Sequence, residues 1–371
     1  MKRQIALLGG QLVPVYLGIR DRAPDIVHLV YSEELRDRVQ ILESLLTSVK
    51  FFKHEVDPYN FQDISETVEA LVLNIEDAQW ELNLTGGTKV MTLASHNIFK
   101  DLGLEAFYLD QKNRFYFFQK KAFVEVKSEI KITTFLKLSG HTSVNKSKIG
   151  DYDRDEFILA MRVLDLMNDD SFEGIYKKLS FNLKDVNISS FSKKEEDLFI
   201  EWKRPNLKIK TKSFEEEFNH DNAFKICFTG LWWELVVADC VRKWSEKKEM
   251  LVGVELLTNS TDKFSKNEID IILNTGHKMI FIECKSGSVK QEDVNKMKVV
   301  KRLYGGISSR SILVCRKLPR KDLLEKCSDL GIDVFALQKE QYKRNSKRYI
   351  GLSAISSLNN RLTKLLASPE I

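Results

Sequence analysis

The stretch EIDIILNTGHKMIFIECK (residues 268–285) contains two apolar runs joined by NTGHK, whose composition is typical of a turn. When the two runs fold back on each other about this turn, Ile271 pairs with Ile282 and Asp270 pairs with Glu283. The stretch therefore predicts an antiparallel hairpin in which two acidic residues face each other across neighbouring strands.

Charged side chains share one face of this hairpin. Side chains alternate along a strand, so Glu283 and Lys285 lie on the face of Asp270, while Cys284 points the other way. Directly opposed like charges destabilise a sheet, and a divalent cation with oxygen ligands would offset the repulsion. Two alternatives remain open: Glu283 and Lys285 neutralise each other on an exposed edge, or the register is shifted by a residue or two.

A third carboxylate lies on a helix that precedes the hairpin. GLWWELVVADCVRKW (residues 230–244) is apolar on almost every side, which predicts a buried helix and a buried Glu234. An unpaired buried carboxylate is costly, so Glu234 should meet a cation or hydrogen-bond donors. A salt bridge to a nearby lysine or arginine is the alternative.

The order of these residues, a helix glutamate, a hairpin aspartate and then E-x-K, resembles the PD-(D/E)XK restriction-endonuclease-like nucleases. The resemblance implies that Asp270 and Glu283 bind one or two divalent metals, Mg²⁺ or Mn²⁺. It also implies that Lys285 positions the attacking water, that Glu234 is an additional ligand, and that the Cys284 carbonyl completes the ligand set.

Two features around this motif leave its details open. No proline precedes Asp270, and Glu268, two residues earlier on the same face, is a competing acid. The helix predicted after the hairpin carries basic residues that fit either a phosphate backbone or a solvated face: Lys290, Lys296, Lys298, Lys301 and Arg302.

The first third of the chain alternates short apolar runs with amphipathic segments. QIALL, IVHLVY, KFFKHEV, WELNL and LEAFYLD are typical of strands, and helices are predicted over 32–49 and 88–102. Alternation of this kind indicates a parallel sheet covered by helices, a Rossmann-like α/β domain. RFYFFQ and AFVEV follow with short turns and predict an antiparallel extension.

A glycine-rich turn, NLTGGTKV, connects one of these strands to a helix. Gly86 and Gly87 let the backbone approach a ligand closely, Thr85 and Thr88 offer hydroxyls, and Lys89 adds a positive charge at a helix N-terminus. The spacing is not that of a Walker A loop. Taken alone, the turn is equally consistent with a plain strand–helix connection.

Together with the loop GGQLVPV (residues 9–15) after the first strand, this turn resembles the CARF domain, the CRISPR-associated Rossmann fold. That resemblance implies a homodimer that binds a cyclic oligoadenylate across its axis. The expected ligand is cyclic tetra-adenylate, contacted by Thr85–Lys89 and by Gly10, Gln11 and Leu12.

The two motifs together resemble the CARF nucleases of type III CRISPR defence. Gly230, Trp232 and Glu234 fit the G-x-W-x-E-like helix of that group. We therefore expect a CARF domain over 1–138, a linker with small helical or winged elements over 139–225, and a PD-(D/E)XK nuclease domain over 226–371. The family implies cleavage of single-stranded RNA or DNA, or nicking of duplex DNA such as a supercoiled plasmid.

Composition sets the remaining expectations. The net charge of +5 permits an anionic partner without requiring one. The five cysteines show no metal-binding spacing, and no segment is long and apolar enough to span a membrane, so we expect a soluble, cytoplasmic protein with reduced thiols and no membrane partner.

Two other functions are compatible with the same sequence. One is a constitutive repair or restriction-type nuclease whose first domain only dimerises or docks on a partner. The other is a ligand-sensing regulator with an inactive nuclease scaffold, against which stands the full set of Glu234, Asp270, Glu283 and Lys285.

Overall fold

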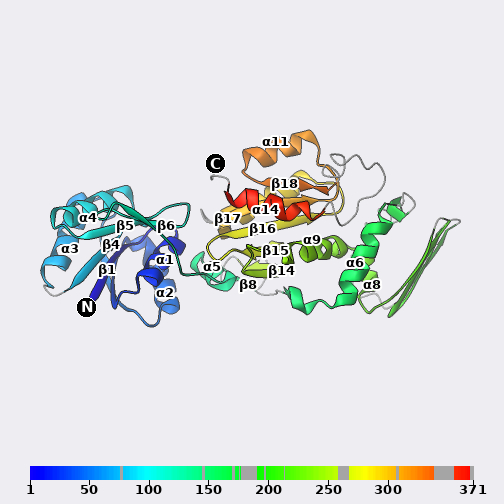
Figure 1. Ribbon diagram of the computed structural model, residues 1–371, viewed down its shortest axis with the longest axis horizontal. Coiled ribbons are helices and arrows are strands. Elements are labelled where there is room, and N and C mark those ends of the chain that lie inside the picture. The colour runs from blue at the N-terminus through cyan, green and yellow to red at the C-terminus, as the bar shows by residue number, and fades with distance from the viewer. Residues whose placement is uncertain are drawn as a thin grey trace.

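The computed structural model in Figure 1 is built from three β-sheets that follow one another along its longest axis. It describes residues 1–75, 78–143, 147–168, 172–174, 176, 190–195, 198–212, 214–257, 267–305, 309–337 and 355–367.

The N-terminal sheet has the strand order β3-β2-β1-β4-β5-β6-β7. The first five strands are parallel and the last two are antiparallel, as the sequence predicts. Their bounds are β1 (Lys2–Leu7), β2 (Ile26–Tyr31), β3 (Lys50–Glu55), β4 (Gln79–Asn83), β5 (Glu105–Leu109), β6 (Arg114–Phe117) and β7 (Ala122–Glu125).

Helices cover both faces of this sheet. On one face lie α1 (Leu12–Arg22), α2 (Arg36–Leu45) and α5 (Ile132–Leu138), and on the other lie α3 (Phe61–Leu73) and α4 (Lys89–Asp101). The sequence predicted α2 and α4 but neither α1 nor α3. The domain is the expected Rossmann-like α/β fold.

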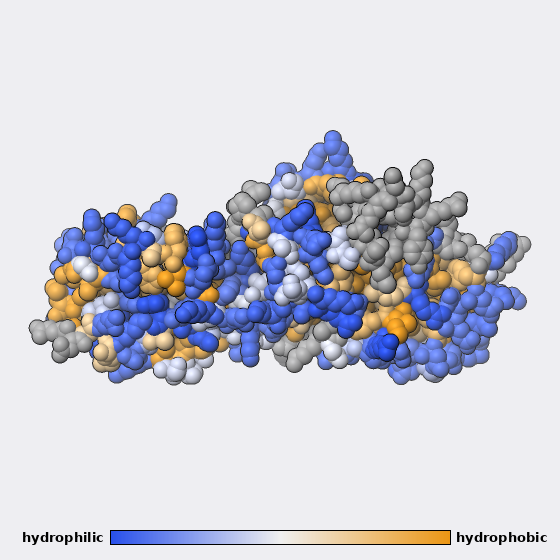
Figure 2. All heavy atoms as spheres, viewed as in Figure 1, coloured by the Kyte–Doolittle hydropathy of each residue, from blue (hydrophilic) through white to orange (hydrophobic). Residues whose placement is uncertain are grey.

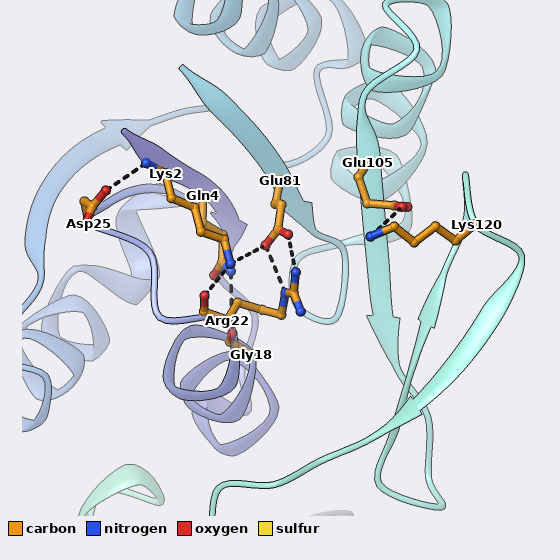
Figure 3. A network of polar contacts seen from close by, with 8 residues as sticks. All are labelled: Lys2, Gln4, Gly18, Arg22, Asp25, Glu81, Glu105 and Lys120. Atoms are coloured by element: carbon orange, nitrogen blue, oxygen red, sulfur yellow. Dashed lines mark hydrogen bonds and ion pairs between the residues drawn. The ribbon is translucent and has the colours of Figure 1, made fainter. Parts of the chain in front are cut away.

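A buried ion network fixes α1 on the sheet (Figure 3). Glu81, on β4, is 3% exposed, and its carboxylate accepts hydrogen bonds from the guanidinium of Arg22, one of them 3.0 Å long from Nε. The Lys2 ammonium lies 3.4 Å from the same carboxylate, and Gln4 Nε2 donates to the Gly18 carbonyl over 3.5 Å. Because two cations flank it, Glu81 stays paired while buried, and α1 is held at its C-terminal end.

The second large sheet has the order β18-β17-β16-β15-β14-β8. The strands β14 (Glu249–Leu257), β15 (Asn267–Asn274) and β16 (Met279–Lys285) are antiparallel, whereas β16, β17 (Ser309–Cys315) and β18 (Asp333–Ala336) are parallel. One face packs on α9 (Leu231–Arg242) and α14 (Ser357–Ala367), and the other on α10 (Gln291–Val300) and α11 (Lys321–Asp329).

The region 139–225 contains more structure than the expected linker. The short strands β8 (Thr142–Ser143) and β9 (Ser147–Lys148) pair with β14. Next come α6 (Arg154–Leu166), a four-stranded antiparallel sheet, and α8 (Ala223–Phe228), whose apolar residues share one core with α9. The sheet, at the right of Figure 1, consists of β10 (Ser190–Glu195), β11 (Leu198–Lys203), β12 (Asn206–Thr211) and β13 (Glu215–Asn219).

The segment around α5 connects the two large sheets. The Ile130 amide donates to the Gly276 carbonyl over 2.7 Å, and the Ile132 amide donates to Glu249 Oε2 over the same distance. Apolar residues of α1, α2 and α5 continue into a cluster with Leu251, Ile272 and Phe281 of the second sheet. The N-terminal domain therefore shares a continuous core with the second domain.

None of the helices in the described ranges is long and apolar enough to cross a bilayer. The five cysteines are buried and free.

Candidate functional sites

The hairpin β15–β16 has the predicted register. Ile271 pairs with Ile282 and Leu273 with Ile280. The turn forms because Asn274 Oδ1 accepts a hydrogen bond of 2.7 Å from the Gly276 amide, and glycine accommodates the positive φ of 98° at that position. The shifted register considered above is therefore excluded.

Asp270 lies in the buried middle of the site and is 8% exposed. Its Oδ2 accepts a hydrogen bond of 2.6 Å from the Cys284 amide, which ties the carboxylate to the E-C-K segment of β16. Burial raises the pKa of Asp270 well above its ordinary value, and the nearby carboxylates of Glu283 and Glu234 raise it further. Without a bound cation, the site thus penalises the charged form of Asp270.

Glu283 is 3% exposed and is held by two lysines. Lys285 Nζ lies 3.0 Å from Glu283 Oε1, and Lys296 Nζ, on α10, donates to Oε1 and Oε2 over 2.9 Å each. Lys285 also lies 3.2 Å from Asp293 Oδ1. The pair of Glu283 and Lys285 therefore exists, but on a buried face and not on the exposed edge that the alternative assumed.

Lys285 remains a cation at neutral pH. Burial opposes its charge, but the adjacent Glu283 carboxylate outweighs this effect and raises the pKa of Lys285 above its ordinary value. A lysine that keeps its proton orients and neutralises anionic groups; it does not act as a general base.

Glu234 reaches the same site from the first turn of α9. The helix is anchored by Trp233, whose indole Nε1 donates to the Val314 carbonyl over 3.0 Å. Its neighbours Trp232, Trp233 and Leu235 are fully buried, but Glu234 itself is partly exposed, so the sequence overstated its burial. Burial still raises the pKa of Glu234 to about 7, with Glu268 and Glu283 adding repulsion.

This shift predicts how stability depends on pH. A carboxyl group whose pKa is raised in the folded state stabilises the fold fully below about 4.5, and this contribution is lost as the pH rises through about 7. Glu234→Gln should therefore be more stable than the wild-type protein at pH 8, by about 3 kcal/mol at most. Thermal unfolding in EDTA between pH 5 and pH 8 measures the difference. A pH dependence identical in both proteins would contradict the shift.

The donor set fits a hard divalent cation, although the side chains do not converge on one. Two carboxylates face each other, and the Cys284 amide and Lys296 only partly compensate the charged form of Asp270, as expected where a cation belongs. Within the described part of the chain, no three His, Cys, Asp or Glu side chains are close enough together to hold a metal ion as they stand. Both oxygens of Glu283 are instead engaged by Lys296.

Sequence reasoning missed the role of two residues of α10. In the sequence, Lys296 resembles the other basic residues of the helix, and Asp293 stands outside the predicted motif. Asp293 and Lys296 are three residues apart and therefore lie on the same side of α10. They are next to the buried Val294 and Met297, so both side chains lie over the hairpin. The basic residues Lys290, Lys298 and Arg302 are exposed.

In the N-terminal domain the two predicted loops touch each other. The loop after β1 ends at Gln11, so Leu12 is the first residue of α1 and is buried. A Cβ atom on Gly9 would lie 2.9 Å from the Gly87 nitrogen, and one on Gly86 would lie 2.1 Å from the Leu7 carbonyl oxygen. Only glycines allow this close backbone approach, which places Gly10 and Gln11 beside the TGGTK turn.

The two threonines of the turn are engaged within the protein. Thr88 caps α4 by accepting from the Met91 amide over 3.1 Å, and its hydroxyl donates to the Pro58 carbonyl over 2.7 Å. Thr85 Oγ1 accepts from the Leu109 amide over 3.0 Å and keeps its own proton for another partner. Lys89 is exposed at the first position of α4.

A cavity of about 520 Å³ lies next to this turn, at the carboxyl ends of β2 and β3. It is unsuited to an anionic ligand because its lining is strongly acidic, with Glu33, Glu34, Glu55, Asp57 and Asp63. The basic and glycine-rich side of the turn is the better place for phosphate groups.

Comparisons with known proteins match both halves of the chain. Residues 4–135 match the Card1 CARF domain family, and residues 221–343 match the Card1-like endonuclease domain family. No curated protein sequence matches the chain.

Solved structures resemble the whole chain. Can2 from Sulfobacillus thermosulfidooxidans, in complex with cyclic tetra-adenylate, aligns with a TM-score of 0.73 at 18% identity, over 99% of this chain and 100% of Can2. Protein VC1899 from Vibrio cholerae aligns with a TM-score of 0.73 at 12% identity, over 99% of this chain and 98% of VC1899.

A type III CRISPR defence DNA nuclease activated by cyclic oligoadenylate aligns with a TM-score of 0.57 at 18% identity, over 92% of this chain and 51% of that one. At these identities the likenesses show a shared fold.

Proposed function

Because the chain is a CARF-domain nuclease, with a Card1-type CARF domain and a Card1-like endonuclease domain, we propose that it is a metal-dependent phosphodiesterase of type III CRISPR defence that a cyclic oligoadenylate activates. The observation that carries the proposal is the buried pair of opposed carboxylates, Asp270 and Glu283, with a protonated lysine beside them in the matched endonuclease domain.

The divalent cation, Mg²⁺ or Mn²⁺, would be held by Asp270, Glu283 and the carbonyl of Cys284, with Glu234 as a further ligand. When bound, such an ion polarises a phosphoryl oxygen and lowers the pKa of a coordinated water. Lys285 stays protonated, so its part is to orient the attacking water and to neutralise the charge that develops on the phosphate. Asp293 keeps Lys285 directed at the site.

The activator is proposed to bind at the TGGTK turn and the loop after β1. Supporting this, the glycines bring the two loops together, α4 presents its N-terminus there, and Lys89 is exposed beside it. A cyclic oligoadenylate is the proposed activator because residues 4–135 match the CARF domain family and because Can2 was solved in complex with cyclic tetra-adenylate. Among these rings we propose cyclic tetra-adenylate. Thr88 serves the turn itself, whereas Thr85, Gly86, Gly87 and Lys89 contact the ring, together with Gly10 and Gln11 of the loop. Leu12, at the start of α1, has a buried side chain and would contribute its backbone.

A ring with two-fold symmetry fits a homodimer of CARF domains. Supporting this, the N-terminal domain exposes apolar side chains on α4, on β5 and on the edge strand β7: Leu93 is 60% exposed, Tyr108 44% and Phe123 53%. Apolar patches, in orange, lie on the surface of this domain at the left of Figure 2. Apolar surface of this kind is favourable to bury against a second copy. We place the protein in the cytoplasm, where its five buried thiols stay reduced.

The substrate is a nucleic acid, either single-stranded RNA or DNA or supercoiled duplex DNA. The exposed basic residues of α10 and its end, Lys290, Lys298 and Arg302, would contact its phosphates.

The test incubates the protein with labelled single-stranded RNA, labelled single-stranded DNA and supercoiled plasmid, each with Mg²⁺ or Mn²⁺ and with or without cyclic tetra- or hexa-adenylate. We expect cleavage of at least one substrate only when metal and activator are both present. Equal cleavage without any cyclic oligoadenylate would identify a constitutive nuclease, and absence of metal binding would identify an inactive scaffold.

A further inference from the structure

Lys296 occupies the position on Glu283 that a divalent cation would take. Its ammonium nitrogen is 2.9 Å from each carboxylate oxygen, so it engages both of the oxygens that Glu283 could offer to a metal ion. Glu283 is 3% exposed, and its carboxylate is further covered by Lys285 at 3.0 Å. In this arrangement the carboxylate is already neutralised by protein groups.

We propose that Lys296 is an internal counter-ion that competes with the catalytic metal for Glu283, and that activator binding withdraws it. This inference rests on the proposed function, since it concerns the regulation of the same site. Lys285 would remain when Lys296 leaves, because Asp293 holds it at 3.2 Å. Lys285 is thus a permanent part of the site, whereas Lys296 can leave it.

The course of α10 supplies the connection to the activator. The helix ends at Val300, four residues after Lys296, and a single π-helical turn, Lys301–Gly305, follows. This turn and the loop after β1 line the same cavity of about 150 Å³, with Arg302 and Leu303 on one side and Gly10 and Gln11 on the other. A ligand that rearranges the loop therefore acts directly on the end of α10.

The π-turn is packed too tightly to absorb such a displacement. A Cβ atom on Gly305 would lie 1.9 Å from Ser309 Oγ and 2.9 Å from the Phe281 ring. Tyr304 is fully buried, with its ring 4.4 Å from that of His141, whose Nε2 lies 2.9 Å from the Leu303 carbonyl oxygen. A push on this turn is expected to move α10, and Lys296 with it, because tightly packed elements shift as units.

The test measures Mn²⁺ binding by calorimetry on the full-length protein, without nucleic acid. Lys296→Met keeps the apolar stem and removes the charge, and Lys296→Gln removes the charge while keeping a hydrogen-bond donor. Both should bind Mn²⁺ at least about tenfold more tightly than the wild-type protein in the absence of activator, because only Lys285 then offsets the charge of Glu283. Lys296→Arg and the exposed Lys298→Met are the matched controls and should bind as the wild type does.

The same measurement with cyclic tetra-adenylate tests the coupling. The activator should tighten Mn²⁺ binding to the wild-type protein, and this gain should shrink in Lys296→Met, since the group to be withdrawn is gone. Cleavage without activator should rise in the same variant.

Several outcomes would overturn the inference. It is wrong if Lys296→Met and Lys296→Gln bind Mn²⁺ no more tightly than the wild type, or if the activator effect on Mn²⁺ affinity is the same with and without Lys296. Failure of the proposed function looks different: the wild-type protein would then bind no Mn²⁺ that depends on Asp270.

Discussion

Asp270→Asn is expected to lose nuclease activity by at least about 1,000-fold, or roughly 4 kcal/mol of transition-state stabilisation, while unfolding at a higher temperature than the wild-type protein. The loss follows because an amide is a poor metal ligand. The gain in stability follows because the variant replaces a carboxyl group whose charged form is penalised in the fold: burial raises the pKa of Asp270 well above its ordinary value, and two neighbouring carboxylates raise it further. The asparagine oxygen can still accept the hydrogen bond from the Cys284 amide, so the hairpin should keep its register.

Cleavage rates and melting temperatures in EDTA, measured on the same preparations, test this expectation. Asp239→Asn is the matched control: Asp239 is also 8% exposed, but it pairs with Arg242 and Lys243 near the C-terminal end of α9. The control should keep its activity and lose stability, the opposite pattern. An Asp270→Asn protein that cleaves at the wild-type rate would remove Asp270 from the site.

Lys89→Glu is expected to weaken binding of cyclic tetra-adenylate by about 100-fold or more, close to 2.7 kcal/mol. Lys89 is exposed at the first position of α4, where its charge and the helix N-terminus together favour an anion. In a dimer that binds one ring, Lys89 is replaced in both subunits, so the loss of binding free energy is twice that of one substitution. Metal binding at the nuclease site should be unchanged when it is measured without activator.

Lys100→Glu is the matched control for that variant, because Lys100 is an exposed lysine at the opposite end of the same helix. Calorimetric titration with the ring measures both variants. Equal affinities for the ring in Lys89→Glu and Lys100→Glu would contradict the placement of the activator at the turn.

The hairpin was predictable because its register is set locally. The residues NTGHK are typical of a turn, and the apolar runs on either side of it have matching lengths. Only one pairing of the two strands then buries the apolar side chains, and β15 and β16 pair in this register. The N-terminal sheet was predictable for a similar reason, since apolar strands alternate with amphipathic segments.

Two helices were missed for different reasons. LVPVYLGIRDR, which forms α1, contains a proline and a glycine and is buried on most sides, so it lacks a helical apolar stripe. Pro14 is tolerated because it lies in the first turn of the helix. For α3 a signal was present: Asn60 caps the helix by accepting hydrogen bonds from the Gln62 and Asp63 amides.

The remaining features depend on contacts between distant segments. The short strands β8 and β9 are ordered by pairing with β14, more than 100 residues away, and their own sequence gives no strand signal. Similarly, no local pattern distinguishes Lys296 from Lys298 on α10, because the distinction depends on which flank of the helix packs over Glu283.

The central claim is that ligand binding in the first domain controls chemistry in the second. The most direct measurement is the initial rate of cleavage in Mn²⁺ as cyclic tetra-adenylate is titrated from zero to excess over the protein. We predict a rise of roughly 100-fold that saturates at one ring per two chains and that Lys89→Glu shifts to higher ligand concentration. A rate that is the same at zero and at saturating ligand, on every substrate cleaved, would contradict the account.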